Sequence, residues 1–142
     1  MLLAGAGAAI GWVLADLSGH GRGWPQARAA ARYARQHFLG GSALLAGALG
    51  LLGGSAGAWT ISGVLAATEA LPTLVVAGGA GLLLLAAMVQ SALVPFHRWL
   101  LSSMTAPTPV SGFMHAGLVN AGGVLLPRFA PAVFDAPAVV PV

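Results

Sequence analysis

The sequence predicts an all-α fold, a polytopic bundle of membrane-spanning helices. Of the 142 residues, 58% are hydrophobic and 6% are charged, whereas a soluble domain carries about 25% charged residues. The mean hydropathy is +0.88. Six basic and three acidic residues cannot cover a packed domain of this length, which excludes a soluble protein. Disordered chains are poor in apolar residues, so disorder is excluded as well.

Four apolar stretches approach the length of about 20 residues that a membrane-spanning helix needs. They cover residues 2–17, 38–57, 71–94 and 108–126. Prolines mark the boundaries of the last two stretches, where a missing N–H costs little at a first turn and ends a helix elsewhere. These prolines are Pro72, Pro95, Pro107, Pro109 and Pro127. We therefore expect about four transmembrane helices.

Basic residues cluster in the predicted loop at residues 21–37. This loop holds Arg22, Arg28, Arg32 and Arg35, and the loop at residues 95–107 holds Arg98. Cytoplasmic loops of membrane proteins carry an excess of basic residues, so both loops are expected inside and the connector at residues 59–71 outside. The net charge of +3 then reflects topology in the cell (inner) membrane rather than a nucleic-acid surface.

Polar side chains inside the predicted spans are costly in lipid, so each needs an explanation. Gln90 and Ser91 lie late in the third span, and Ser111 and His115 lie in the fourth. Residues four apart share one face of a helix, which predicts that Ser111 and His115 lie side by side. A histidine gains and loses a proton near neutral pH, and His115 is the only titratable residue deep in any predicted span. It is either a station on a proton path or a histidine that packs against a neighbouring helix.

His97 follows Pro95 at the inner end of the third span, beside Arg98 and Trp99. Either His97 belongs to the same proton path, or these residues form an interfacial anchor of aromatic and basic side chains. Asp16, at the end of the first span, is expected at the interface.

The sequence offers no centre for catalysis and no site for a metal or a cofactor. It contains no cysteine, which excludes disulfides, thiolate zinc sites and iron–sulfur ligation. His37 lies at the end of a span and His115 nearer a middle, so their depths do not match for a haem held between helices. A phosphate-binding glycine loop, a nucleophile elbow and a zinc-type histidine cluster are all missing from the sequence.

Residues 88–129 resemble the signature of the proton-conducting, antiporter-like membrane subunits related to complex I. The family pattern is a Lys-Ser-Ala segment, then P-x-x-x-W-L, then a PTPVSALIHA stretch that opens the next helix. The matching positions are Ser91-Ala92, Pro95, Trp99-Leu100, Pro107, Thr108, Pro109, Val110, Ser111 and His115-Ala116. The resemblance implies a membrane helix bundle with His115 in a proton path.

Two branches of this family differ at informative positions. NADH-quinone oxidoreductase subunit L usually reads WLPDAM where this chain has Leu101-Ser102 after its Trp-Leu pair. The segments HRWLLSSM, MHAGLVNAGG and RFAP are more similar to the DAB-type inorganic-carbon transporter membrane subunit. Gln90 falls where the complex I branch places a buried lysine, and glutamine cannot take up or release a proton.

The resemblance implies a subunit that conducts protons past the polar residues named above to energise a large, soluble, zinc-dependent partner in CO2/bicarbonate transport. The alternative is a proton-translocating subunit assembled with other complex I subunits; in neither case does the chain hold a redox or hydrolytic centre. Family members have a dozen or more helices. Residues 1–142 are therefore expected to form a single transmembrane domain from the middle of a longer transporter, with residues 129–142 as a proline-rich tail or stub. A third alternative is a non-functional truncated fragment.

Overall fold

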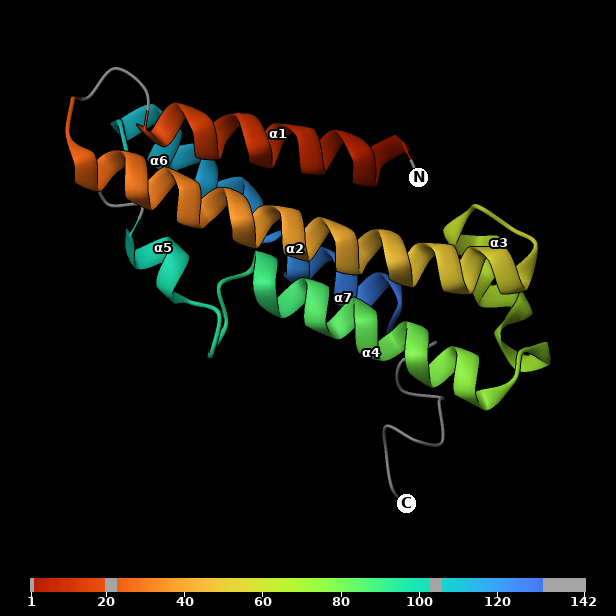
Figure 1. Ribbon diagram of the computed structural model, residues 1–142. Helices are drawn as coiled ribbons and strands as arrows, with labels where there is room; N and C mark the ends of the chain where they lie inside the picture. The colour runs from red at the N-terminus through yellow and green to blue at the C-terminus, as the bar shows by residue number, and fades with distance from the viewer. Residues whose placement is uncertain (1, 20–22, 103–105, 132–142) are drawn as a thin grey trace.

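The computed structural model describes residues 2–19, 23–102 and 106–131 (Figure 1). Helices dominate this part of the chain, and it contains no β-strand. In chain order the helices are α1 (Leu2–Gly19), α2 (Pro25–Ala56), α3 (Ile61–Ala67), the 3-10 helix η1 (Thr68–Ala70), α4 (Thr73–Gln90), α5 (Arg98–Ser102), α6 (Thr108–Phe113), the π-helix η3 (Met114–Leu118) and α7 (Ala121–Arg128). The all-α prediction is confirmed.

The long helix α2 is the axis of the bundle. α1 packs along one side of it and α4 along another, and α7 lies against α4 (Figure 1). The side of α2 that packs against these helices is built from small and apolar residues. They are Ala27, Ala30, Ala31, Ala34, Phe38, Gly41, Leu45, Ala48, Leu52 and Gly53. At about 1.5 Å per residue, the 32 residues of α2 span about 48 Å, which exceeds the roughly 30 Å of a bilayer's hydrocarbon core.

The arginine-bearing segment, which we expect from the sequence to be a loop, forms the first half of α2. Pro25 opens the helix, where its fixed φ suits the first turn. Alanine and arginine, which are strong helix formers, fill the following turns and carry Arg28, Arg32 and Arg35 on the helix. Arg22 lies outside the described residues. Because α2 is longer than the hydrocarbon core is thick, its charged first half can extend beyond the core.

The third predicted span ends earlier than the apolar pattern indicates. α4 stops at Gln90, and a turn begins at Ser91. Ala92 has φ of 52°, an uncommon value for a residue with a Cβ. Pro95 disfavours helical backbone at the residue before it, which explains why the chain leaves the helix before residue 94.

The fourth predicted span is helical in three successive pieces. α6, η3 and α7 follow one another, with a turn at residues 119–120 between the last two. Asn120 donates from Nδ2 to the carbonyl of Ala116 at 3.0 Å, and such bonds to the backbone compete with regular helix. Gly122 and Gly123 follow, and glycine has low helix propensity. Of the described helices, α2 and α4 are long and apolar enough to cross a membrane, and the apolar part of α1, residues 7–17, is shorter.

The buried core has two parts. One joins α2, α3, α4 and α7 around Leu45, Leu52 and Leu83. The other joins α1, α2, α5 and η3 around Phe38 and Trp99. The predicted connector at residues 59–71 contains α3 and η1.

Phe129, the first residue of the predicted tail, is buried in the first of these clusters. Residues 132–142 lie outside the described residues. The tail therefore remains a prediction for those residues.

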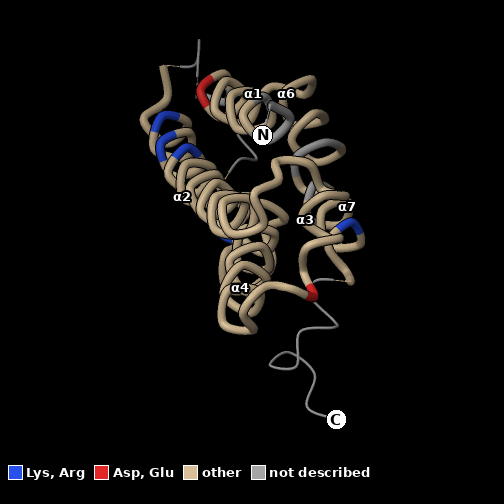
Figure 2. Tube along the Cα trace, turned by 90° about the vertical axis from the view of Figure 1, so that its right-hand side faces the viewer, with Lys and Arg blue, Asp and Glu red and all other residues tan. Residues whose placement is uncertain are grey.

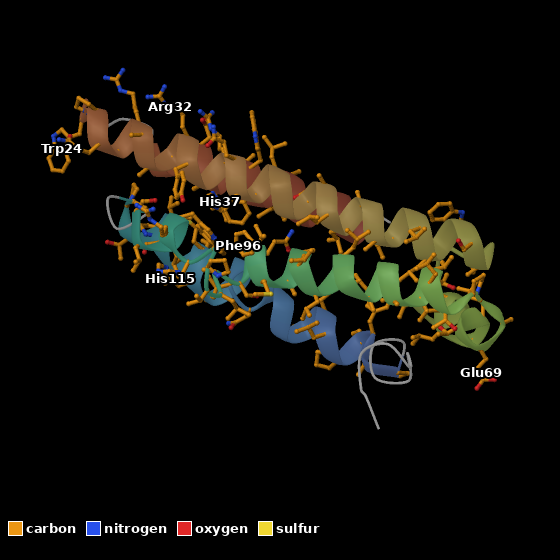
Figure 3. The ribbon with its side chains drawn as sticks, turned by 60° about the horizontal axis from the view of Figure 1, so that its bottom comes forward. Trp24, Arg32, His37, Glu69, Phe96 and His115 are labelled. Atoms are coloured by element: carbon orange, nitrogen blue, oxygen red, sulfur yellow. The ribbon has the colours of Figure 1, made fainter. Side chains whose placement is uncertain are left out.

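Charged side chains mark the two ends of the bundle. Figure 2 shows the arginines of α2 at one end, with the acidic residue of α1 beside them. Figure 3 places Trp24 and Arg32 at this end and Glu69 at the opposite end. We call the end that carries Arg28, Arg32, Arg35 and Asp16 the arginine end.

Candidate functional site

Ser111 and His115 lie on successive turns and contact each other. His115 Nδ1 is 2.8 Å from the Ser111 carbonyl oxygen and 3.4 Å from Ser111 Oγ, which confirms the face predicted by their spacing. A carbonyl oxygen only accepts, so Nδ1 carries the proton in this bond, and in the neutral ring Nε2 is left with a free lone pair. The His115 side chain is exposed at the surface formed by the described residues. His115 thus offers a proton-accepting nitrogen toward the outside of the bundle.

The π-helix η3 sets the direction of this ring. The N–H of Val119 bonds to the carbonyl of Met114 at 3.1 Å, five residues earlier rather than four. π-Helical turns are rare and occur frequently at functional sites. Met114 is fully buried with Phe38 and Ala34 of α2. His115 therefore lies near the arginine end, rather than near the middle of a span as the sequence indicates.

Gln90 and Ser91 end α4 and turn toward different neighbours. Ser91 Oγ accepts a hydrogen bond from the N–H of Gly122 at 3.1 Å. Gln90 lies over Gly41 of α2, where an added Cβ would come within 2.9 Å of Gln90 Cγ. Within the described ranges, neither side chain forms a hydrogen bond with His115.

The bond from Gly122 to Ser91 follows from the break in the fourth helical segment. The N–H groups in the first turn of a helix have no partner within the helix, and α7 begins at Ala121. Ser91 supplies the missing acceptor from α4. Sequence reasoning singled out Ser91 but missed Gly122; the signal available in the sequence is the Gly-Gly pair that begins two residues after Asn120.

Trp99 is a core residue, not an interfacial anchor. It is fully buried, its Nε1 donates to the carbonyl of Val89 at 3.0 Å, and its ring meets Phe38 edge-on with centroids 4.8 Å apart. The anchor reading is therefore wrong for this residue. Arg98 beside it is exposed.

His97 is partly buried, and its Nδ1 is a buried nitrogen without a hydrogen-bond partner among the described residues. A buried polar nitrogen left unpaired costs free energy. The place of His97 on a proton path stays a prediction.

The prolines of the sequence motif set the backbone of the site. Pro107 caps α6 with φ of −57° and ψ of 146°, Thr108 is the first helical residue, and Pro109 occupies the first turn. The peptide bond before Pro95 is cis. Pro107 and Pro109 therefore fix where α6 begins.

An ion pair joins α1 to α2 at the arginine end. Arg35 Nη1 is 2.9 Å from Asp16 Oδ1, and the membrane-interface position expected for Asp16 stays a prediction. No group of three or more potential metal ligands occurs within the described ranges. Imidazole and hydroxyl groups of this arrangement can exchange or relay protons, whereas the Gln90 amide can only donate and accept hydrogen bonds.

Comparison with known proteins bears on this site. The family model described as "NADH:quinone oxidoreductase/Mrp antiporter, TM" matches residues 9–140. The chain is 36% identical over 131 residues to "Probable inorganic carbon transporter subunit DabB" of Hydrogenovibrio crunogenus, which covers 87% of this chain and 25% of that protein. It is 57% identical over 54 residues to the protein of the same name from Bacillus anthracis, covering 38% of this chain and 11% of that protein. It is also 50% identical over 60 residues to "NADH-ubiquinone oxidoreductase chain 5" of Schizophyllum commune, covering 42% of this chain and 9% of that protein.

The chain spans a quarter or less of the length of these relatives. The family match nevertheless extends over most of the chain and contains every residue of the polar site from Gln90 to Asn120. The resemblance drawn from residues 88–129 is confirmed, with inorganic-carbon transporter subunits and a complex I subunit among the relatives. The chain therefore belongs to the transmembrane NADH:quinone oxidoreductase/Mrp antiporter family.

Proposed function

We propose that this chain forms part of the membrane subunit of an inorganic-carbon transporter, in which proton flow energises CO2/bicarbonate transport. One observation carries the proposal: the similarity to a probable inorganic carbon transporter subunit extends over 87% of the chain. Gln90 also favours the carbon-transporter branch over the complex I branch. The complex I branch has a lysine at this position, and the amide of glutamine cannot exchange a proton as a lysine does. The subunit is placed in the cell inner membrane, which the chain crosses several times.

His115 exchanges protons in this proposal. The Ser111 carbonyl, 2.8 Å away, holds the proton on Nδ1, so Nε2 takes up a proton and then releases it. The exposed ring leaves Nε2 accessible to water or to other helices of a longer subunit. A proton that crosses a membrane potential releases ~2.3 kcal/mol per 100 mV, and this is the energy that the subunit transmits.

The other polar groups position water and relay hydrogen bonds. Ser91 and Ser111 offer hydroxyls, which both donate and accept, and Gln90 offers an amide with the same capacity. His97 provides a second imidazole beside the end of α4. The partner is a large soluble zinc protein, and its zinc ion would supply a Lewis acid for the hydration of CO2 to bicarbonate.

A second candidate is a proton-translocating subunit of complex I. It is favoured by the similarity to NADH-ubiquinone oxidoreductase chain 5 over 60 residues. Co-purification separates the two: the carbon-transport proposal expects a large zinc protein, and the alternative expects several NADH dehydrogenase subunits.

The substitution His115→Ala tests the proposal. The subunit is expressed with its partner in a bacterium that lacks carbonic anhydrase and grows only in high CO2. We expect the unmodified subunit to restore growth in air and the His115→Ala variant to lose that growth, while the partner still co-purifies.

His37→Ala is the matched control, because His37 Nδ1 makes the same contact, 2.9 Å from the carbonyl of Tyr33 four residues earlier. The control variant is expected to retain growth in air. If His115→Ala supports growth as well as the control does, the assigned role of His115 is wrong.

A further inference from the structure

A groove of about 380 Å³ runs between α1 and α2 on the outer surface of the bundle. Its walls are almost entirely apolar. They are formed by Ala8, Ala9, Trp12, Val13, Phe38, Leu39 and Ser42. Small residues on α1 make the floor, and Trp12 and Leu39, which are 46% and 58% exposed, stand at its sides. An apolar groove open to the outside of a membrane protein faces lipid or another helix.

The groove continues into the arginines of α2. Arg28, Arg32, Arg35, Leu39 and Ser42 follow one another at spacings of four and three, so they lie on one face of the helix. Seven residues of helix separate Arg32 from Leu39, a rise of about 10 Å. One end of the apolar groove is therefore positively charged.

The charged end lies at the level of lipid headgroups. Counting back roughly 20 residues from the end of α2 at Ala56, the length that a span needs, reaches the helical turn after Arg35. Arg35 is paired with Asp16 at 2.9 Å, and its guanidinium carbon lies 5.9 Å from the centre of the Trp12 ring. The same count puts Ser42 within the span, at the depth of the hydrocarbon.

Arg28 and Arg32 remain available to a ligand. Both are exposed, and neither forms an ion pair within the described ranges. Figure 3 shows Arg32 extending away from the rest of the bundle. Three arginines and one paired aspartate leave two unbalanced positive charges at the arginine end, on the helix face that continues into the groove.

We propose that this groove binds an anionic phospholipid, with an acyl chain between α1 and α2 and the phosphate on Arg32 and Arg28. The charge decides the occupant: a guanidinium binds phosphate through paired N–H donors, whereas a further apolar helix has no use for the unpaired arginines. A zwitterionic lipid brings its own cation to the same place and binds more weakly. Trp12 then touches the acyl chain.

Trp12 is also the probe that tests the proposal. The protein is placed in phosphatidylcholine vesicles that contain a minor fraction of brominated phosphatidylglycerol or, in a parallel sample, brominated phosphatidylcholine. The contribution of Trp12 to fluorescence is taken as the difference from the Trp12→Phe variant. We expect brominated phosphatidylglycerol to quench Trp12 far more strongly than brominated phosphatidylcholine does.

Two variants locate the lipid. Arg32→Gln is expected to lower the preference for phosphatidylglycerol about fivefold, which corresponds to ~1 kcal/mol for one basic residue near an anionic lipid. Ala9→Phe fills the groove without changing charge and is expected to lower quenching by phosphatidylglycerol. Arg128→Gln is the matched control, because Arg128 is an exposed arginine on α7, and it is expected to leave the preference unchanged.

Three results would overturn the proposal. Equal quenching by the two lipids means that Trp12 meets bulk lipid only. Quenching by neither lipid means that another protein segment covers the groove. If the Ala9→Phe variant keeps the preference for phosphatidylglycerol, the arginines attract anionic lipid without binding it in the groove.

Discussion

At the scale of single residues, the contact between α4 and α7 depends on Gly122. An added Cβ at this position would overlap Ser91 Oγ and come within 3.3 Å of Ala87 Cβ. Gly122→Ala is therefore expected to push the two helices apart and to destabilise the protein by about 1–3 kcal/mol, the usual cost of overpacking. Thermal unfolding in detergent measures the change as a fall in Tm.

Gly123→Ala is the matched control for this prediction. It lies one residue further along the same helix, and an added Cβ there meets nothing within 4 Å. Alanine favours helix over glycine by roughly 0.5–1 kcal/mol, so this variant is expected to keep or raise the Tm. Equal losses of stability in the two variants would show that the close approach to Ser91 does not matter.

Some of the site at this scale could be predicted from the sequence, and some could not. The pairing of Ser111 with His115 follows from their spacing, because it needs only the geometry of one helix. The contact between Ser91 and Gly122 joins residues 31 apart and depends on where two helices end. Spacing within one element carries no information about that contact.

At the scale of elements, α5 folds back so that Trp99 caps the end of α4. The last carbonyls of a helix have no partner inside it, and Trp99 Nε1 satisfies that of Val89. Trp99→Phe keeps an aromatic ring against Phe38 but removes the 3.0 Å bond to this carbonyl, which keeps the longer bond from the Ala92 N–H at 3.4 Å, at a cost of about 0.5–1.5 kcal/mol. The expected result is a lower Tm and faster hydrogen exchange at the end of α4.

Trp24→Phe serves as the comparison for Trp99→Phe. Trp24 is 59% exposed and makes no side-chain cap bond to α2. The substitution of Trp24 is expected to change the Tm as little as other substitutions of exposed residues do. Similar effects of the two substitutions would argue against the capping role.

Apolar runs located the helices better than they located the helix ends. The apolar pattern predicts that the third span reaches residue 94, because it continues past Gln90. The helix instead ends at Gln90, and backbone constraints around Pro95 set the turn at Ser91 and Ala92. The basic segment was predicted as a loop because charge separates it from lipid. Charge, however, does not prevent a helix from extending beyond the membrane, as the first half of α2 does.

At the scale of the whole molecule, large apolar side chains cover the outside as well as the core. Ile10, Leu74, Phe113 and Val124, on four different parts of the chain, are each more than half exposed. This distribution matches the membrane character predicted from composition. Hydrophobicity alone therefore does not distinguish the faces that contact lipid from those that contact further helices of a longer subunit. Polar features such as His115 and the arginine end are needed to tell these faces apart.

The arrangement of charge predicts how the molecule lies in its membrane. Arg28, Arg32 and Arg35 gather at one end and Glu69 lies at the other (Figures 2 and 3), and basic residues remain on the cytoplasmic side. The chain contains no cysteine, so single cysteines can be introduced as reporters without altering the background. Gly23→Cys places a thiol at the arginine end, and Ser62→Cys places one on α3; both positions are exposed.

In intact cells, a thiol reagent that cannot cross the membrane is expected to label Ser62→Cys at once. Gly23→Cys is expected to react only after the membrane is permeabilised, because the excess of basic residues predicts that the arginine end lies inside. Labelling of both variants in denatured protein controls for thiol reactivity. The reverse pattern in intact cells would invert the topology and put His115, near the arginine end, on the outer side.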